Sequence, residues 1–333
     1  YCFYFFLQGV FLAYKKFNFS SKVLNDLGSY SYFIGLSNNF DAKCVSSNPN
    51  DHNIINWYLQ WKDKSPKIRT IGHSISNLGD FQIDDINISY VEPFPKLQGF
   101  KQINFILISI FLFFYSLFLL IFNPYQALLY QEIIKSQRVR LLRKNQLAQD
   151  YLFSNSSYIY RPLWTYEAEK KGSRILLYFY SANLELTEVS KMHTLQHSWH
   201  LMSWPNYLVW DKYQANFIKK YNKRKFTMKE VGSIWFSSCD EEVEVPPDSI
   251  AVFDITPFRV SWHSSLGVSF EYYTYDLVNK FLTDIKLVLN ENNIKMLHKM
   301  KRSSDLANKK YIRRVKLLSN DSSYINVNPS IDA

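Results

Sequence analysis

The chain contains little cysteine, and what it has is scattered. Three cysteines, Cys2, Cys44 and Cys239, occur in 333 residues, odd in number and outside any C-x-x-C spacing. A disulfide framework needs paired cysteines and a zinc site needs closely spaced ligands, so the sequence indicates neither. This cysteine usage suits a reducing cytoplasm.

Several familiar motifs are also missing. The sequence contains no P-loop, G-x-G-x-x-G or G-x-S-x-G segment, which removes the commonest signatures of nucleotide and acyl chemistry. No helix-turn-helix, RNP or zinc-finger pattern occurs, so we expect no nucleic-acid partner despite the net charge of +10. The basic residues gather in 135–144 and 299–316, where they suit anionic lipid or nucleotide phosphates.

What the sequence does have is one long apolar run, residues 103–122, without a charge. At about 1.5 Å per helical residue, a helix of this length could cross a hydrocarbon core of about 30 Å. Lys101 alone precedes the run closely, whereas residues 135–144 after it are basic. Such a flank usually stays cytoplasmic, so we expect the downstream half to be cytoplasmic.

Strand patterns on both sides of the run complicate a simple span. Residues 67–75 and 86–94 precede it and are rich in β-branched and aromatic residues. Strands and helices also alternate after 147, and an α/β domain needs all its strands in one compartment. Three arrangements remain open: a true span, a hydrophobic helix lying in or against one leaflet, and a buried core helix.

The ends of the chain give two further expectations. Residues 1–14 are apolar but too short for a confident span, and we expect a core helix or a second interfacial segment there. The chain starts at Tyr1 without a methionine and stops at Ala333 where an element begins, so we expect a fragment.

After the basic segment, predicted as a helix continuing to about Asp150, the pattern is that of an α/β domain. An acidic, Pro-containing linker follows this domain at 239–249. The predicted elements are a strand at 151–156, a helix at 161–172, a strand at 174–183, a strand followed by a helix within 206–222, and a strand at 229–236.

A second α/β domain is predicted after the linker. It comprises strands at 249–255, 294–299 and 324–327 and an amphipathic helix at 274–293, with Thr274 as its N-cap. The fold class is therefore α/β, with two successive domains that would bind a ligand at their strand carboxyl ends. The predicted division is 1–100 (N-terminal region with part of the first domain), 101–146 (hydrophobic helix with basic extension), 147–238 (remainder of the first domain), 239–249 (linker) and 250–333 (start of the second domain).

Several segments, in the same order, resemble the bacterial surface-polysaccharide biosynthesis proteins that are named for a PFTS motif. They are PLWTYEAEKKGSRILLYFYSAN, WPNYLVWDKYQ, VGSIWF, FDITPFR, LGVSFEYYT and the strand before KMKR. The resemblance covers roughly residues 125–333, and the naming motif would follow shortly after Ala333.

The resemblance implies a glycosyltransferase of the GT-B type, with two Rossmann-like domains of which the second is incomplete here. It implies a nucleotide sugar as donor substrate, a lipid-linked saccharide acceptor at the membrane, and neither a cofactor nor a metal. The absence of an Asp-x-Asp motif disfavours the metal-dependent GT-A type. Two alternatives remain open: a non-enzymatic membrane-anchored scaffold or export factor, and a GT-B-type nucleotide-sugar epimerase.

Candidate substrate-binding residues stand after predicted strands. Lys299, Lys301 and Arg302 would neutralise the leaving diphosphate, unless they are merely a solvated strand end. Arg259 follows the first strand of the second domain and would face the ligand, unless it forms a structural ion pair. Asn155 ends a strand and could approach a sugar, although simple turn chemistry also explains it.

Histidines supply the candidate catalytic groups. His193, His197 and His200 would share one side of a helix, but the stretch lacks the Glu of H-E-x-x-H and precedes the Trp204-Pro205 step. We therefore predict no metal, and consider His197 or His200 as the general base or an acceptor contact. His263 could contact substrate from the loop that holds Arg259; ordinary surface or core histidines are the alternative.

Overall fold

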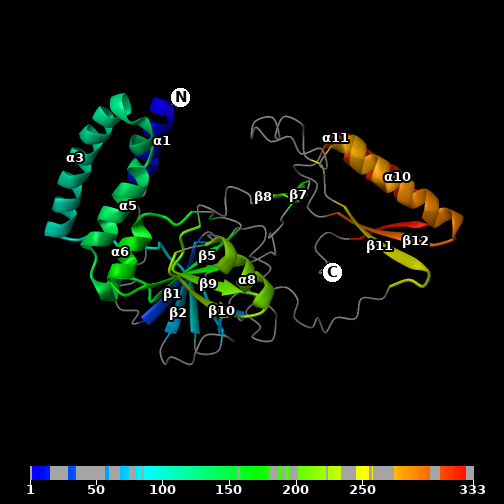
Figure 1. The fold of residues 1–333 in the computed structure, drawn as a ribbon, viewed down its shortest axis with the longest axis horizontal. Coiled ribbons are helices and arrows are strands. Elements are labelled where there is room, and N and C mark those ends of the chain that lie inside the picture. Colours follow the sequence, from blue (N-terminus) through cyan, green and yellow to red (C-terminus); the bar gives the residue numbers. More distant parts are fainter. Residues whose placement is uncertain are drawn as a thin grey trace. The chain divides into compact units, whose positions relative to one another are not determined.

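The computed structural model contains two compact units, Tyr1–Ser238 and Cys239–Ala333 (Figure 1). Both units alternate strands with helices, so the predicted α/β class is confirmed. The structure describes residues 2–15, 29–34, 57–59, 68–74, 80–83, 86–155, 158, 160–179, 187–189, 192–194, 202–222, 224–233, 245–254, 257, 274–300 and 308–327.

The first unit is built on an eight-stranded sheet in the order β10-β9-β6-β5-β1-β2-β4-β3. Seven of the strands are parallel, and only β3 runs antiparallel to its neighbour β4. The strands are β1 (Ser29–Ile34), β2 (Ile68–His73), β3 (Phe81–Ile83), β4 (Ile86–Tyr90), β5 (Asp150–Ser154), β6 (Arg174–Tyr178), β9 (Asn206–Val209) and β10 (Thr227–Glu230).

The strand order reverses direction once. From β1 the chain moves through β2 to β4 on one side, then returns to place β5 on the other side of β1 and continues outward through β6 and β9 to β10. In an open α/β sheet such a reversal is a topological switch point, which lies between the first strand and the one that follows the return. In this sheet the reversal point lies between β1 and β5.

One sheet face is covered by α5 (Tyr130–Leu141), α6 (Trp164–Lys170) and α8 (Lys212–Tyr221). Aromatic residues from β1, β5 and β9 form the core beneath them, which also includes Trp164 and Trp204. The opposite face is covered in part by Trp57 and Tyr58, whose rings lie 5.8 Å from Tyr178 and 5.5 Å from Phe33 respectively. Asp211 caps α8 as the sequence predicts, since its Oδ1 accepts from Gln214 N at 2.8 Å.

The long apolar run forms α3 (Phe100–Phe122), inserted in the connection from β4 to β5. After Asn123 the chain reverses into α4 (Pro124–Leu128) and α5, and α1 (Cys2–Lys15) packs beside them (Figure 1). Among the described helices, α3 alone is long and apolar enough to cross a membrane, judged by length and composition. Only 17% of the most apolar 18-residue stretch of this helix is buried, so α3 is not a buried core helix.

The second unit contains a parallel three-stranded sheet in the order β11-β12-β13. Strands β11 (Ser249–Asp254), β12 (Lys295–Met300) and β13 (Tyr324–Val327) alternate with α10 (Tyr275–Glu291) and α11 (Lys309–Leu318). Apolar residues of both helices, such as Leu282 and Val315, pack with Met296 of β12 in one core.

Two local predictions from the sequence are wrong. The basic helix ends at Leu141 rather than near Asp150, because Leu142 and Arg143 adopt extended backbone before a short 3-10 turn, Lys144–Gln146. The strand expected at 229–236 is β10, Thr227–Glu230, which pairs with β9 over four residues. β10 is an edge strand, where one ladder and a half-exposed surface leave a weak sequence signal.

Candidate functional site

The reversal point between β1 and β5 is the candidate ligand site of the first unit. In open α/β sheets the loops diverge at such a point, and ligands bind outside the carboxyl ends of the strands. Here those ends are Ile34 on β1 and Ser154 on β5. Register places Ile34 beside Phe153, so Ser154 extends one residue further toward the loop side.

Asn155 lies directly after β5 at this edge. Its backbone N donates to the Tyr178 carbonyl at 3.1 Å, which ties it to the end of β6. The Ser154 carbonyl accepts from Tyr158 N at 3.0 Å, so the chain turns immediately after the strand. The half-buried Asn155 is thus held at the reversal point, the position at which the sequence predicted a ligand contact.

His73 ends β2 on the other side of β1, and the sequence analysis missed it as a site residue. It is buried, in register with Phe33 of β1 and with Tyr90 of β4, whose ring lies 6.2 Å from the imidazole. Strand alternation puts His73 on the same sheet face as Ser154, with β1 between them. The available signal was a polar residue at a strand end, the same pattern that identified Asn155.

A buried ionic cluster lies at the opposite, amino end of the sheet. Arg174 donates to both carboxylate oxygens of Asp150, and Tyr58 OH donates to Oδ2 at 2.6 Å. Burial raises the pKa of the Tyr58 hydroxyl, and the Asp150 charge raises it further. Because ligands bind at carboxyl ends in this architecture, we interpret this cluster as structural.

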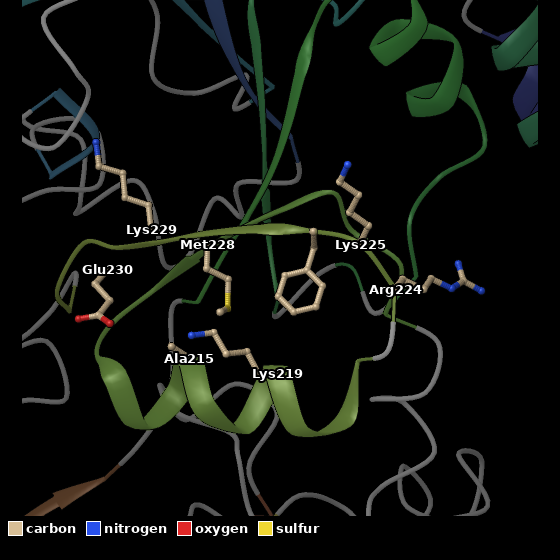
Figure 2. A pocket seen from close by; sticks show the side chains of 8 residues that line it. Ala215, Lys219, Arg224, Lys225, Met228, Lys229 and Glu230 are labelled. Atoms are coloured by element: carbon tan, nitrogen blue, oxygen red, sulfur yellow. The ribbon is translucent and has the colours of Figure 1, made fainter.

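A basic hollow of about 740 Å³ lies at the sheet edge, between α8 and β10 (Figure 2). Figure 2 shows Met228 and Lys219 turned toward the space between strand and helix, whereas Lys225 and Lys229 point to the other side of the strand. Phosphate binding needs converging donors, and these cations diverge. The hollow is also three strands away from β5, so we do not assign it to the candidate site.

In the second unit, Lys299 lies near the carboxyl end of β12. It is half-buried and in register with Phe253 of β11 and Val327 of β13. Beside it the buried Asp254 ends β11, where its Oδ2 accepts from Tyr311 OH and lies 3.0 Å from His298 Nε2. Lys299 thus lies at the strand edge where the sequence predicted diphosphate binding; that role stays a prediction.

The remaining predicted site residues, His197, His200, Arg259, His263, Lys301 and Arg302, lie outside the described residues. His193 is described, and it lies in a short strand, β8 (Met192–Thr194), so the shared helix considered for three histidines does not form around it. Within the described ranges, no group of three or more His, Cys, Asp or Glu side chains could hold a metal ion.

The sequence profile described as "Polysaccharide biosynthesis PFTS motif protein" matches residues 113–333, about two thirds of the chain. The chain belongs to this family. The resemblance predicted from the segments after 125 is therefore confirmed, and the PFTS family places the chain in polysaccharide biosynthesis. Comparison with curated proteins gives no significant match.

Proposed function

We propose that this PFTS family protein transfers a sugar from a nucleotide-sugar donor to a lipid-linked acceptor during surface polysaccharide synthesis. The observation that carries the proposal is the reversal of strand order between β1 and β5, with Asn155 held at the carboxyl edge. Doubly wound sheets bind nucleotide-like ligands at this position, and polysaccharide synthesis requires activated sugars. The PFTS family match supports that pathway.

The residues at this edge suit carbohydrate recognition. A carboxamide such as that of Asn155 both donates and accepts hydrogen bonds, as sugar hydroxyls do. As the GT-B type implies, Lys299 of the second unit and the predicted Lys301 and Arg302 would neutralise the diphosphate of the donor. His197 or His200 would serve as the base that removes the proton from the acceptor hydroxyl.

The proposal also includes the cytoplasmic side of the inner membrane, where nucleotide sugars are made. It is supported by the basic segment 135–144, since basic flanks of apolar helices stay cytoplasmic.

The test is ligand-induced thermal stabilisation of the full-length protein by UDP-, GDP-, TDP- and CMP-sugars. A donor at about a hundred times its dissociation constant should stabilise the fold by about 2.7 kcal/mol. Asn155→Ala should raise the dissociation constant of the donor that stabilises the protein about tenfold, because one to two hydrogen bonds are lost. The control is Asn87→Ala, an exposed position near the amino end of β4.

Sugar transfer is then measured with the donor that stabilises the protein. Release of nucleotide with lengthening of an acceptor supports a transferase, whereas conversion of the sugar without an acceptor identifies an epimerase. If no nucleotide sugar stabilises the folded protein, the proposal fails in favour of a scaffold. If Asn155→Ala binds donor as tightly as Asn87→Ala, the site assignment fails.

A further inference from the structure

We propose that α3, α4 and α1 form a hydrophobic projection that inserts into one leaflet of a lipid bilayer, entering and leaving through the same surface. This proposal does not depend on sugar transfer. It concerns how the chain meets the membrane. The sequence left a span, a one-leaflet helix and a buried core helix open, and the exposure of α3 excludes the core helix.

The sheet topology excludes a single crossing by α3. Strands β1, β2 and β4 precede α3 in the chain, whereas β5 and β6 follow it. β5 is hydrogen-bonded directly to β1, so strands from both sides of α3 lie in one ladder. A sheet cannot continue through a bilayer with its edges unpaired, so both ends of the segment between β4 and β5 lie on one side.

A second crossing would be required to return, and the chain after α3 is too short for it. Glu132 lies nine positions after Asn123, the turn that ends α3, and its Oε2 already accepts from Leu163 N of the sheet domain at 3.2 Å. Nine helical residues span about 13 Å, less than half of a hydrocarbon core of about 30 Å. The projection can therefore reach only part of the way across.

The next turns of α5 are fixed to the domain as well. Arg138 donates to the carbonyls of Phe94 and Pro95 at 3.0 Å each, and Lys171 of the segment after α6 donates to the carbonyl of Arg140 at 3.0 Å. These contacts hold α5 against the domain beside α6, so α5 is not available as a spanning return helix.

The surface of the projection is apolar and suits a hydrocarbon surrounding better than water. No charged residue occurs between Lys101 and Glu132. Large apolar side chains are exposed around α3 and also on α1 and α4; they include Phe3, Phe11, Leu107, Ile110, Phe111, Phe114, Phe118, Ile121, Phe122, Tyr125 and Leu128. A contiguous apolar surface of this extent is not left to water in soluble proteins.

Three polar side chains of the projection are hydrogen-bonded within it, as an apolar surrounding requires. Ser109 Oγ donates to the Phe105 carbonyl at 2.7 Å, and Tyr130 OH donates to the Ser109 carbonyl at 3.2 Å. Asn123 Oδ1 accepts from Gln126 N, which caps α4 at the tip. The apolar helices are also packed to one another, since Phe6 of α1 contacts the rings of Phe113 and Tyr130.

The flanks of the projection favour a lipid surface as the occupant. Between residues 92 and 144 the acidic residues are Glu92 and Glu132, against the basic Lys96, Lys101, Lys135, Arg138, Arg140, Arg143 and Lys144. A charge-free tip above a basic base matches a hydrocarbon layer beneath anionic headgroups. Neither a second copy of this chain nor a soluble partner would require that order of charges.

Flotation of the full chain with vesicles of phosphatidylcholine and phosphatidylglycerol in a 3:1 ratio tests lipid binding. Wild type should float. The double substitution Phe111→Asp with Phe118→Asp places two charges on exposed side chains and should lower the bound fraction at least tenfold, with the unfolding midpoint unchanged. The matched control is Tyr213→Asp, an exposed aromatic on α8, which should float like wild type.

Single-cysteine variants in sealed vesicles test the depth. With the native cysteines replaced by serine, Lys96→Cys and Lys144→Cys should react with an impermeant maleimide from the same side, and Tyr125→Cys should not react from the opposite side. Reaction of Lys96→Cys and Lys144→Cys from opposite faces, or of Tyr125→Cys from the far face, would establish a span and overturn the proposal. Failure of wild type to float, with dimers in sedimentation that the double variant abolishes, would assign the surface to a second copy.

Discussion

Arg174 holds the buried carboxylate of Asp150 through two parallel hydrogen bonds, Nε to Oδ1 and Nη2 to Oδ2, each 2.7 Å long. The Asp150 side chain is 0% exposed and the Arg174 side chain is 46% exposed. The pair joins the amino ends of β5 and β6, which are neighbours in the sheet. Tyr58 extends the link, because its hydroxyl bonds both Asp150 and Ser31 of β1 at 2.6 Å.

Arg174→Ala should lower the free energy of unfolding by about 1–3 kcal/mol, because a buried carboxylate loses its counter-charge. The value is below that of a fully buried pair, since water screens the exposed arginine. Urea unfolding measures the change. The control is Lys170→Ala, which removes an exposed partner of Glu167 and should cost less than about 0.5 kcal/mol. Equal losses in the two variants would contradict a special role for the Asp150 pair.

Gly72→Ala should also destabilise the first unit. A Cβ at Gly72 would lie 2.7 Å from Cδ2 of Tyr32 and 2.8 Å from Cγ2 of Val91. Tyr32 cannot move freely, because it is buried in the core and its hydroxyl donates to the Val91 carbonyl at 2.7 Å. We expect a loss of about 1–3 kcal/mol in urea unfolding.

Gly9→Ala is the control for Gly72, since no atom lies within 4 Å of the added Cβ. It lies within α1, where alanine favours the helix by up to about 1 kcal/mol over glycine. Gly72→Ala should therefore lower the free energy of unfolding, whereas Gly9→Ala should raise it or leave it unchanged. A neutral Gly72→Ala would show that the strand shifts to accommodate the methyl group.

Glu132 connects the base of the projection to the sheet domain. Glu132→Ala should cost about 1 kcal/mol, because Leu163 N, at the start of α6, loses its acceptor. Lys135→Ala removes only the ion pair with Glu132, 3.0 Å long and partly exposed, and should cost less than about 0.5 kcal/mol. Chemical unfolding of both variants separates the hydrogen bond from the ion pair. A larger loss in Lys135→Ala would reverse that assignment.

Alkaline pH should weaken the fold because several tyrosines are buried. Burial raises the pKa of Tyr207 and of Tyr158 to about 12, against about 10 in the unfolded chain. Above pH 10 the folded state therefore retains protons that the unfolded state has lost. The contribution to stability is full below pH 10 and is lost as the pH rises toward 12.

Unfolding free energies measured from pH 8 to 11.5 check this expectation. Tyr207→Phe removes one titrating group. It should therefore reduce the slope with which the unfolding free energy falls above pH 10, by up to the contribution of one proton. It also loses the hydrogen bond from Asn222 Nδ2, 2.9 Å long, at every pH. The decisive quantity is therefore the slope and not the absolute stability. Slopes equal to wild type would show that Tyr207 ionises as easily in the folded protein as in the unfolded chain.

Local sequence patterns were enough to locate most elements after the apolar run. The strands β5, β6 and β11 and the capped helix α8 lie where apolar runs and Asp211 predicted them. β13 coincides with the predicted 324–327. These signals are local, because apolar periodicity and caps are properties of consecutive residues. The edge strand β10 was misplaced, since it has little burial to impose a pattern.

The sequence by itself determined the α/β class, the long apolar helix and the polar residue, Asn155, that directly follows β5. Only the tertiary structure decided which strands are neighbours, and with that the position of Asn155 at a reversal of strand order and of His73 across β1. It also decided against a single crossing by α3, because β5 bonds to β1. The physical reason is that pairing between strands more than a hundred residues apart depends on the packing of the whole sheet, which no local pattern records.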